Sequence, residues 1–173
     1  MKPLFPMILP LVLVACAQDN PQGATARPAA SSLEAPASSM EVSRDYMRVP
    51  IRGPDDWFTG ATTVTPLFDR NGISQVGAAL VRFEPGARTA WHVHPLGQRL
   101  VVLEGFGRTQ VDGGEMEIIR AGDVVWCPPG VRHWHGAAPD TAMLHIAIQE
   151  SQDGSPVTWM EHVTDDQYRG DLE

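Results

Sequence analysis

Three histidines and one glutamine stand at spacings that could build a metal site. His92 and His94 are two residues apart, so on a strand both imidazoles would point to the same face. Residues 95–97, Pro-Leu-Gly, have the composition of a tight turn, which would bring Gln98 onto the neighbouring strand beside that pair. His133 follows a Pro-Pro-Gly turn on a later strand. Imidazole nitrogens and one amide oxygen suit a divalent transition metal with positions left open for water or substrate.

The alternative is that the His-x-His pair is structural, because an isolated pair of this kind usually faces solvent or belongs to a satisfied core. Here the pair lies inside a longer pattern of glycines, prolines and a third histidine. The first stretch runs from Gly86 to Gly105, and the second from Gly122 to His133. Five of the six histidines fall between residues 92 and 145. The complete pattern therefore favours metal binding.

These two stretches resemble the two motifs of the cupin superfamily, whose members are small antiparallel jelly-roll barrels with the metal in the barrel mouth. Two positions depart from the usual motifs. Gln98 stands where most cupins have glutamate, and Ala137 stands where the second motif often ends in asparagine. A neutral ligand set would leave a divalent ion its full charge and make it a stronger Lewis acid. The resemblance implies an all-β, single-domain cupin fold.

A finer resemblance is to the bacterial manganese cupins that include (R)-selective hydroxynitrile lyases. It covers roughly residues 54–169 and is carried by residues 56–60, 83–92, 122–126, 133–139 and 159–165. The resemblance implies a divalent metal, Mn2+ first with Fe2+ or Zn2+ as alternatives, on His92, His94, Gln98 and His133. It also implies that the pocket contains Ala79, Val81, His135, His145 and Gln149.

Strand parity independently predicts what surrounds the ion. On the strand expected over residues 141–149, every polar residue stands at an odd position and the even positions are all apolar, so the odd set should face a cavity. That set includes His145 and Gln149. On an earlier strand the small Ala79 shares a face with Val81 and leaves room for a ligand.

We therefore expect a metal-dependent lyase that cleaves or forms the carbon-carbon bond of cyanohydrins of small aldehydes. His135, two residues after His133, should point inward and take the hydroxyl proton. His145 or Gln149 would then orient or protonate the leaving group. The structural alternative for His135 or His145 is that it only holds a partner by a hydrogen bond.

Two rival functions belong to other classes. One is another metal-dependent cupin enzyme, such as an iron-dependent dioxygenase or a decarboxylase-like protein. The other is a non-catalytic lipoprotein that binds metal or a small ligand. Oxygen consumption by the iron form would indicate the first, and tight binding without turnover the second.

Residues 1–16 have the pattern of a lipoprotein signal peptide. Lys2 precedes an apolar run that ends in Leu-Val-Ala before Cys16, and the run is too short and too broken by prolines to span a bilayer. Cys16 stands where bacterial lipoproteins carry the lipid, and Ala17 follows it, as in lipoproteins passed to an outer membrane. We expect an exported, lipid-anchored protein, at the periplasmic face of the outer membrane in a Gram-negative host and otherwise at the cell surface. The alternative is a plain signal peptide cut elsewhere.

Composition divides the remaining chain into a tether and one domain. Residues 17–45 are rich in Ala, Ser, Pro, Gln and Gly and predict a disordered tether, whereas residues 46–173 are long enough for a single core. With Cys16 used as an anchor, only Cys127 is left, so no internal disulfide is expected. We expect Cys127 to be a small packed residue, with a thiol ligand or nucleophile as the alternative.

The net charge of the chain indicates which classes of binding partner to expect. The chain carries a net charge of −8 and no basic patch interleaved with aromatic residues, which argues against nucleic-acid binding. The expected partners are a small-molecule substrate, the membrane through the lipid on Cys16, and further copies of the chain in a homo-oligomer.

Glycines and prolines divide the domain into short elements. Asp112-Gly113-Gly114 predicts a hairpin turn, and residues 163–172 predict a short C-terminal helix capped by Thr164. Trp91 and Trp134 stand at odd offsets from the candidate ligands and should point away from the metal. Strands are predicted over residues 75–83, 90–94, 98–103, 107–111, 115–119, 123–127 and 141–149.

Overall fold

The computed structural model describes residues 39–170. The predicted signal peptide, with Cys16, and nearly all of the predicted tether lie outside these described residues. One compact unit begins at Glu41. Within the described range, no helix has the length and apolar character needed to cross a membrane.

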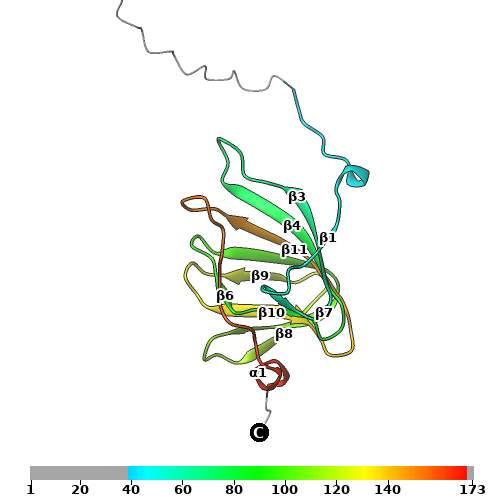
Figure 1. Ribbon diagram of the computed structural model, residues 1–173, viewed down its shortest axis with the longest axis vertical. Helices are drawn as coiled ribbons and strands as arrows, with labels where there is room; N and C mark the ends of the chain where they lie inside the picture. Colours follow the sequence, from blue (N-terminus) through cyan, green and yellow to red (C-terminus); the bar gives the residue numbers. More distant parts are fainter. Residues whose placement is uncertain (1–38, 171–173) are drawn as a thin grey trace, which may run out of the picture. The chain divides into compact units, whose positions relative to one another are not determined.

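The described chain is almost entirely β-structure (Figure 1). A 3-10 turn, η1 (Asp45–Met47), comes first, and a short helix, α1 (Asp165–Arg169), comes last. The all-β fold with a short C-terminal helix is therefore confirmed. The strands are β1 (Ile51–Arg52), β2 (Phe58–Thr59), β3 (Thr62–Phe68), β4 (Val76–Phe83), β5 (Arg88–Thr89), β6 (His92–Val93), β7 (Gln98–Val111), β8 (Met116–Arg120), β9 (Val124–Cys127), β10 (His133–Ala137), β11 (Met143–Glu150) and β12 (Thr158–Trp159).

The strands form one antiparallel sheet in the order β1-β3-β4-β11-β7-β10-β5-β2. The long strand β7 joins its two halves, because its first part pairs with β11 and β9 and its second part pairs with β10 and β8. The sheet curls around its concave face (Figure 1). This curl brings β6 and β10, which carry histidines, opposite β4 and β11.

Two strand predictions were wrong. The segments 98–103 and 107–111 belong to one continuous strand. Gly105 lies within this strand, close to a register irregularity between β7 and β11, and does not end it. Of the segment 90–94 only His92–Val93 form a strand, β6, and residues 90–91 separate it from β5. Both short strands pair with β10, but β5 also pairs with β2 and β6 also pairs with β12. Strands β1, β2, β3, β5 and β12 were not predicted, and four of these five have only two residues, too few to show a period.

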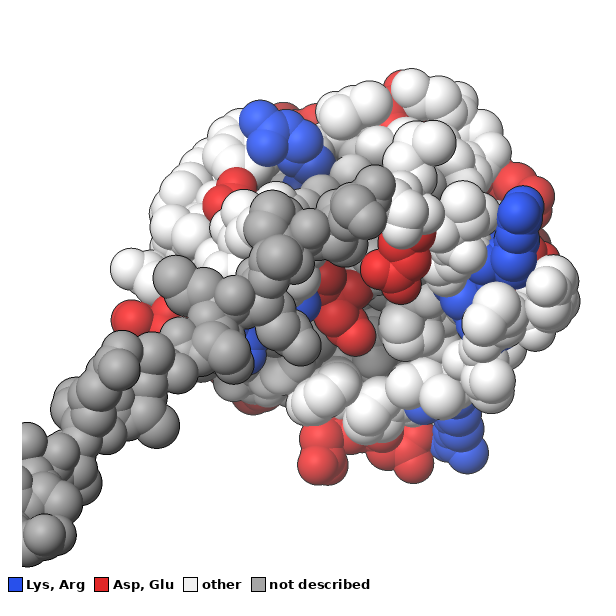
Figure 2. Space-filling model, turned by 90° about the horizontal axis from the view of Figure 1, so that it is seen from above, with Lys and Arg blue, Asp and Glu red and all other residues white. Residues whose placement is uncertain are grey.

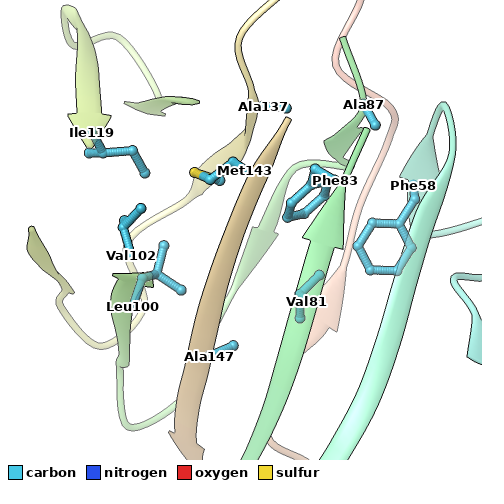
Figure 3. Close-up of a cluster of buried hydrophobic side chains, with 10 residues drawn as sticks. All are labelled: Phe58, Val81, Phe83, Ala87, Leu100, Val102, Ile119, Ala137, Met143 and Ala147. Atoms are coloured by element: carbon cyan, nitrogen blue, oxygen red, sulfur yellow. The ribbon is translucent and has the colours of Figure 1, made fainter. Parts of the chain in front are cut away.

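The apolar core lies on the concave face (Figure 3). On β11, Met143, His145 and Ala147 are buried while the even positions are half-exposed, as strand parity predicted. The core side chains shown in Figure 3 are Phe58, Val81, Phe83, Ala87, Leu100, Val102, Ile119, Ala137, Met143 and Ala147.

A second apolar cluster joins Trp91 and Trp134 to Val163 and Tyr168 near the C-terminal helix. Both tryptophans thus pack in a cluster separate from the concave-face core, which confirms that they turn away from the candidate ligands. The helix itself has the predicted start, since Thr164 and Gln167 form a reciprocal capping box. The predicted hairpin turn at residues 112–114 also connects β7 to β8 as expected.

Charged side chains are spread over the surface in small groups among uncharged residues on the face seen in Figure 2. Several form exposed ion pairs, such as Arg82 with Glu84 at 2.9 Å and Arg52 with Asp55 at 2.7 Å. Exposed pairs of this kind contribute little to the free energy of folding. The stability of the domain therefore depends mainly on its two apolar clusters.

Gly105 gives a test of how tightly β7 and β11 are joined. Its φ is +67°, and a Cβ there would overlap the carbonyl oxygen of Ala142. Gly105→Ala should lower the free energy of unfolding by about 2–5 kcal/mol, because the left-handed backbone and the overpacking both act against it. The matched control is Gly113→Ala, at φ +72° with no atom within 4 Å of an added Cβ. It should lose only about 1–2 kcal/mol in urea unfolding. Equal losses in the two variants would contradict the close contact.

Candidate metal centre

Four side chains predicted as ligands are buried at the junction of β6, β7 and β10. His92 lies on β6 directly opposite His133, the first residue of β10, and their ring centroids are 4.3 Å apart. The ring of His94 lies 5.1 Å from that of His92 and 5.7 Å from that of His133. Gln98 begins β7 and is also buried. The curled sheet therefore gathers residues from two separated motifs into one place.

Backbone carbonyls orient all three imidazoles. The Nδ1 of His92 lies 2.9 Å from the carbonyl oxygen of Ala90, and the Nδ1 of His133 lies 2.9 Å from that of Val131. Because a carbonyl oxygen only accepts, each Nδ1 must carry the proton. The lone pair of each ring is then on Nε2, which is the form that binds a metal.

The third imidazole, that of His94, is also held by a backbone carbonyl, but by one that is distant in the sequence. The Nδ1 of His94 lies 2.7 Å from the carbonyl oxygen of Pro156. Across residues 39–170, the buried Nε2 atoms of His94 and His133 find no hydrogen-bond partner. Buried polar atoms without partners are rare in folded proteins, so their presence here fits a site that takes an ion.

Gln98 presents its oxygen to the same place. Its Nε2 donates to Oε1 of Gln149 at 3.2 Å, and its Oε1 has no partner among the described atoms. An amide oxygen with a free lone pair is a suitable ligand for a divalent cation. Gln149 thus holds the Gln98 amide in this orientation, a contact that strand parity could not predict.

His135 offers a second way to group three ligands. One ring nitrogen each from His92, His133 and His135 lies within 4.8 Å of the others. However, among the described residues no backbone carbonyl holds the Nδ1 of His135, which has no hydrogen-bond partner. The set that includes His94 and Gln98 is better arranged to bind a metal ion, because a backbone carbonyl fixes the tautomer of every imidazole in it.

Burial keeps the candidate ligands neutral. It lowers the pKa of His94 to about 4, and it lowers the pKa of His133. The pKa of His92 falls well below its usual value, mainly through burial and then through the neighbouring His133 and His94. Metal binding requires a deprotonated nitrogen, so near neutral pH no proton has to leave these rings first.

Two more imidazoles lie deeper on the concave face. His135 and His145 are both buried, with ring centroids 5.0 Å apart, and Phe83 packs against each. Burial lowers the pKa of His145 to about 4, and burial followed by His145 lowers the pKa of His135 well below its usual value. Within the part of the chain that is described, neither ring nitrogen of His145 is hydrogen-bonded. The structural alternative, a hydrogen bond that holds a partner, is therefore not seen for His145.

His92, His94 and Gln98 open onto a cavity of about 440 Å³, which His133 does not line. Ala79 and Val81 line it, as predicted, together with His135, His145 and Gln149. Strand parity did not predict its aromatic wall, formed by Trp57, Phe58 and Trp159.

Within this wall Trp57 and Trp159 are stacked, with centroids 5.4 Å apart and an interplanar angle of 10°. Trp159 also lies 4.8 Å from the ring of His92. A planar, apolar group would therefore fit beside the candidate ligands. The one indication in the sequence was that these aromatic residues lie in segments shared with the hydroxynitrile lyase group. The strands in or next to which they lie are too short to show a hydrophobic period that would place the side chains.

Cys127 does not line this cavity. It is buried at the end of β9, is the one free cysteine of the described chain, and burial raises its pKa to about 11. A thiol in this state is a poor ligand and nucleophile. The interpretation of Cys127 as a packed residue is confirmed by its burial.

Comparisons with known proteins agree with this geometry. Residues 79–148 match the cupin domain family. The chain is 58% identical over 130 residues to an (R)-mandelonitrile lyase of Granulicella tundricola, which spans 75% of this chain and 99% of that protein.

Solved structures are also similar. A cupin-like protein from Thermotoga maritima is 46% identical, with a TM-score of 0.65 over 68% of this chain and 90% of that one. The polyketide cyclase RemF from Streptomyces resistomycificus, at 20% identity and a TM-score of 0.57 over 76% of this chain and 92% of that one, shares the fold alone. With its two motifs, its curled antiparallel sheet and a relative matched over nearly its whole length, the chain belongs to the cupin family.

Proposed function

We propose that this protein is a metal-dependent hydroxynitrile lyase that cleaves or forms cyanohydrins of small aldehydes. The observation that carries the proposal is the 58% identity to an (R)-mandelonitrile lyase over 99% of that enzyme's length. The cavity supports it, since apolar walls, candidate metal ligands and two neutral imidazoles meet there.

The residues that would hold the metal are His92, His94, Gln98 and His133. We propose Mn2+ as the ion, on the resemblance to manganese cupins, with Fe2+ or Zn2+ as alternatives. When bound, the ion supplies Lewis-acid polarisation of the substrate oxygen.

The other residues of the cavity bind substrate and move its proton. The aromatic wall of Trp57, Phe58 and Trp159 would hold the apolar group of the aldehyde and exclude water. A ring nitrogen of His135 would take the hydroxyl proton of the cyanohydrin. The O–H electron pair then forms the carbonyl bond, and the pair of the breaking carbon-carbon bond leaves with cyanide.

The proton held by His135 would pass to cyanide, so that an aldehyde and hydrogen cyanide are released. His145, 5.0 Å from His135 between ring centroids, would orient the leaving group through a ring N–H. The Nε2 of Gln149 can still donate to the leaving group, as expected from the sequence, while its Oε1 accepts a hydrogen bond from the candidate ligand Gln98. We propose that it orients this ligand.

The function is tested with protein purified without added metal. Its metal content is measured, and the protein is then assayed for cleavage of mandelonitrile and for synthesis from an aldehyde and cyanide. Turnover that follows metal content supports the proposal. Oxygen consumption by an iron-loaded form without cyanohydrin turnover would instead indicate a dioxygenase, and tight metal binding without any turnover a binding protein.

His94 tests the ligand set. His94→Ala should remove most of the bound metal and lower the melting temperature, since a ligand at 100 times its dissociation constant stabilises the native state by about 2.7 kcal/mol. The control is His162→Ala, because His162 is exposed and bonds only to Thr59. Full metal occupancy in His94→Ala, measured by elemental analysis, would refute the assignment.

A substitution at His135 distinguishes the role of catalytic base from the role of metal ligand. His135→Ala should keep its metal while turnover of mandelonitrile falls by ~10²–10⁴-fold, the range typical of lost acid-base catalysis. Loss of metal together with activity would make His135 a ligand, as its closeness to His92 and His133 allows. Activity within a few-fold of the wild type would remove His135 from the mechanism and move the base role to His145.

A lipid anchor and self-association are separate proposals that come from the sequence. If Cys16 carries the lipid, Cys16→Ser in the full chain should move the protein from membrane fractions to soluble fractions. Immunoblotting of the fractions measures this, with the unaltered chain as the control. Unchanged fractionation would mean that another signal, or none, operates. Sedimentation velocity of the domain tests for the homo-oligomer.

A further inference from the structure

His94 differs from the other two candidate ligand histidines in what orients it. The carbonyls that hold His92 and His133 belong to residues two positions earlier in the chain. The carbonyl that holds His94 belongs to Pro156, 62 residues later. The tautomer of this one ligand therefore depends on a distant segment.

That segment is the C-terminal strap, which we define as residues 155–170. It runs antiparallel beside β6, with Trp159 paired to His92 in the β12–β6 ladder, and then continues to α1 (Figure 1). The backbone N–H of Met160 donates to the carbonyl of Trp91 at 2.9 Å, and the N–H of Trp91 donates to the carbonyl of Glu161 at 3.0 Å. These bonds fix the strap next to the strand that carries the ligands.

A buried arginine fixes the far part of the strap. Arg88 on β5 is 6% exposed, and its guanidinium donates twice to the carbonyl of Val163, at 2.9 and 3.2 Å. It also donates to the carboxylate of Asp165 at 2.7 Å and lies 4.7 Å from the centre of the Tyr168 ring. A guanidinium is buried at a free-energy cost unless its donors are satisfied. Here the strap accepts from Nε and Nη2, and the carbonyl of Gly86 accepts from Nη1 at 3.5 Å.

A second bond holds the end of the strap. The hydroxyl of Tyr168 donates to the carbonyl of Ala137 on β10 at 2.7 Å, and Arg108 on β7 donates to the carbonyl of Tyr168 at 3.0 Å. The same strap supplies Pro156, Val157 and Trp159 to the cavity wall. One segment therefore reaches both the candidate metal ligands and the substrate cavity.

We propose that the C-terminal strap helps to form the metal centre and that Arg88 is a positioning residue. By holding the strap, Arg88 keeps the Pro156 carbonyl on Nδ1 of His94 and so sets the affinity for the metal. This inference rests on the metal centre of the proposed function. Without the carbonyl, the His94 ring can rotate or move its proton to Nε2, and the lone pair is lost for part of the time. Loss of such an orienting partner lowers metal affinity by about 10–100-fold.

The experiment measures metal affinity rather than activity. Arg88→Met keeps an apolar stem of similar length and removes the donors, so its Mn2+ affinity, measured by competition with a chelator, should fall about 10–100-fold. The visible spectrum of bound Co2+ should change as well, because it reports the ligand geometry. The matched control is Asp165→Asn, which alters the exposed partner but leaves both bonds to the Val163 carbonyl, and its Mn2+ affinity should stay within twofold.

Two further variants separate positioning from simple loss of stability. Gly105→Ala, which destabilises the sheet at the contact between β7 and Ala142, should keep the wild-type Mn2+ affinity at a temperature where it is folded. If Arg88→Met does not fold, Tyr168→Phe removes only the hydroxyl that bonds to Ala137, and it should lower the Mn2+ affinity several-fold. If Arg88→Met folds and keeps the wild-type affinity and an unchanged Co2+ spectrum, the inference is overturned. If Arg88→Met does not fold, the same result in Tyr168→Phe overturns it. A wild-type protein that binds no Mn2+, Co2+ or other divalent ion would instead overturn the metal centre itself.

Discussion

The hydrogen bonds from three buried imidazoles to backbone carbonyls are the interaction on which the site depends. Each bond places a proton on Nδ1 and leaves the lone pair on Nε2. Burial adds to this arrangement by lowering the pKa values of the rings. The candidate ligand rings are therefore neutral and hold fixed tautomers, and within residues 39–170 the buried Nε2 atoms of His94 and His133 have no hydrogen-bond partner.

The curled sheet provides the surroundings that make such burial possible. Strand β7 runs through both halves of the sheet, so the strands with the ligands face the strands that bear Ala79 and His145. The apolar core on the concave face removes water from the imidazoles (Figure 3). The second cluster, around Trp91 and Trp134, packs the opposite side chains of the ligand-bearing segments. The metal residues thus lie between two apolar layers, which limits their motion.

The C-terminal strap links the periphery of the domain to its centre. Arg88 and Tyr168 hold residues 163–168, while the carbonyl of Pro156, nine residues before the helix, orients a candidate ligand. Trp159 in the same segment stacks on Trp57 to close the cavity. One piece of backbone therefore contacts both a candidate metal ligand and the cavity beside it.

Local and periodic features of the sequence determined much of this protein. The spacing of His92 and His94, the alternation along β11, the hairpin at Gly113 and the cap at Thr164 each involve neighbours whose geometry the backbone fixes. The aromatic wall, the Gln98–Gln149 bond, the split of residues 90–94 and the clamp by Arg88 were decided by the tertiary structure alone. They join positions 51 to 102 residues apart, or lie on two-residue strands. Such contacts depend on how the sheet curls and where the strap crosses it, and no local period in the chain encodes either.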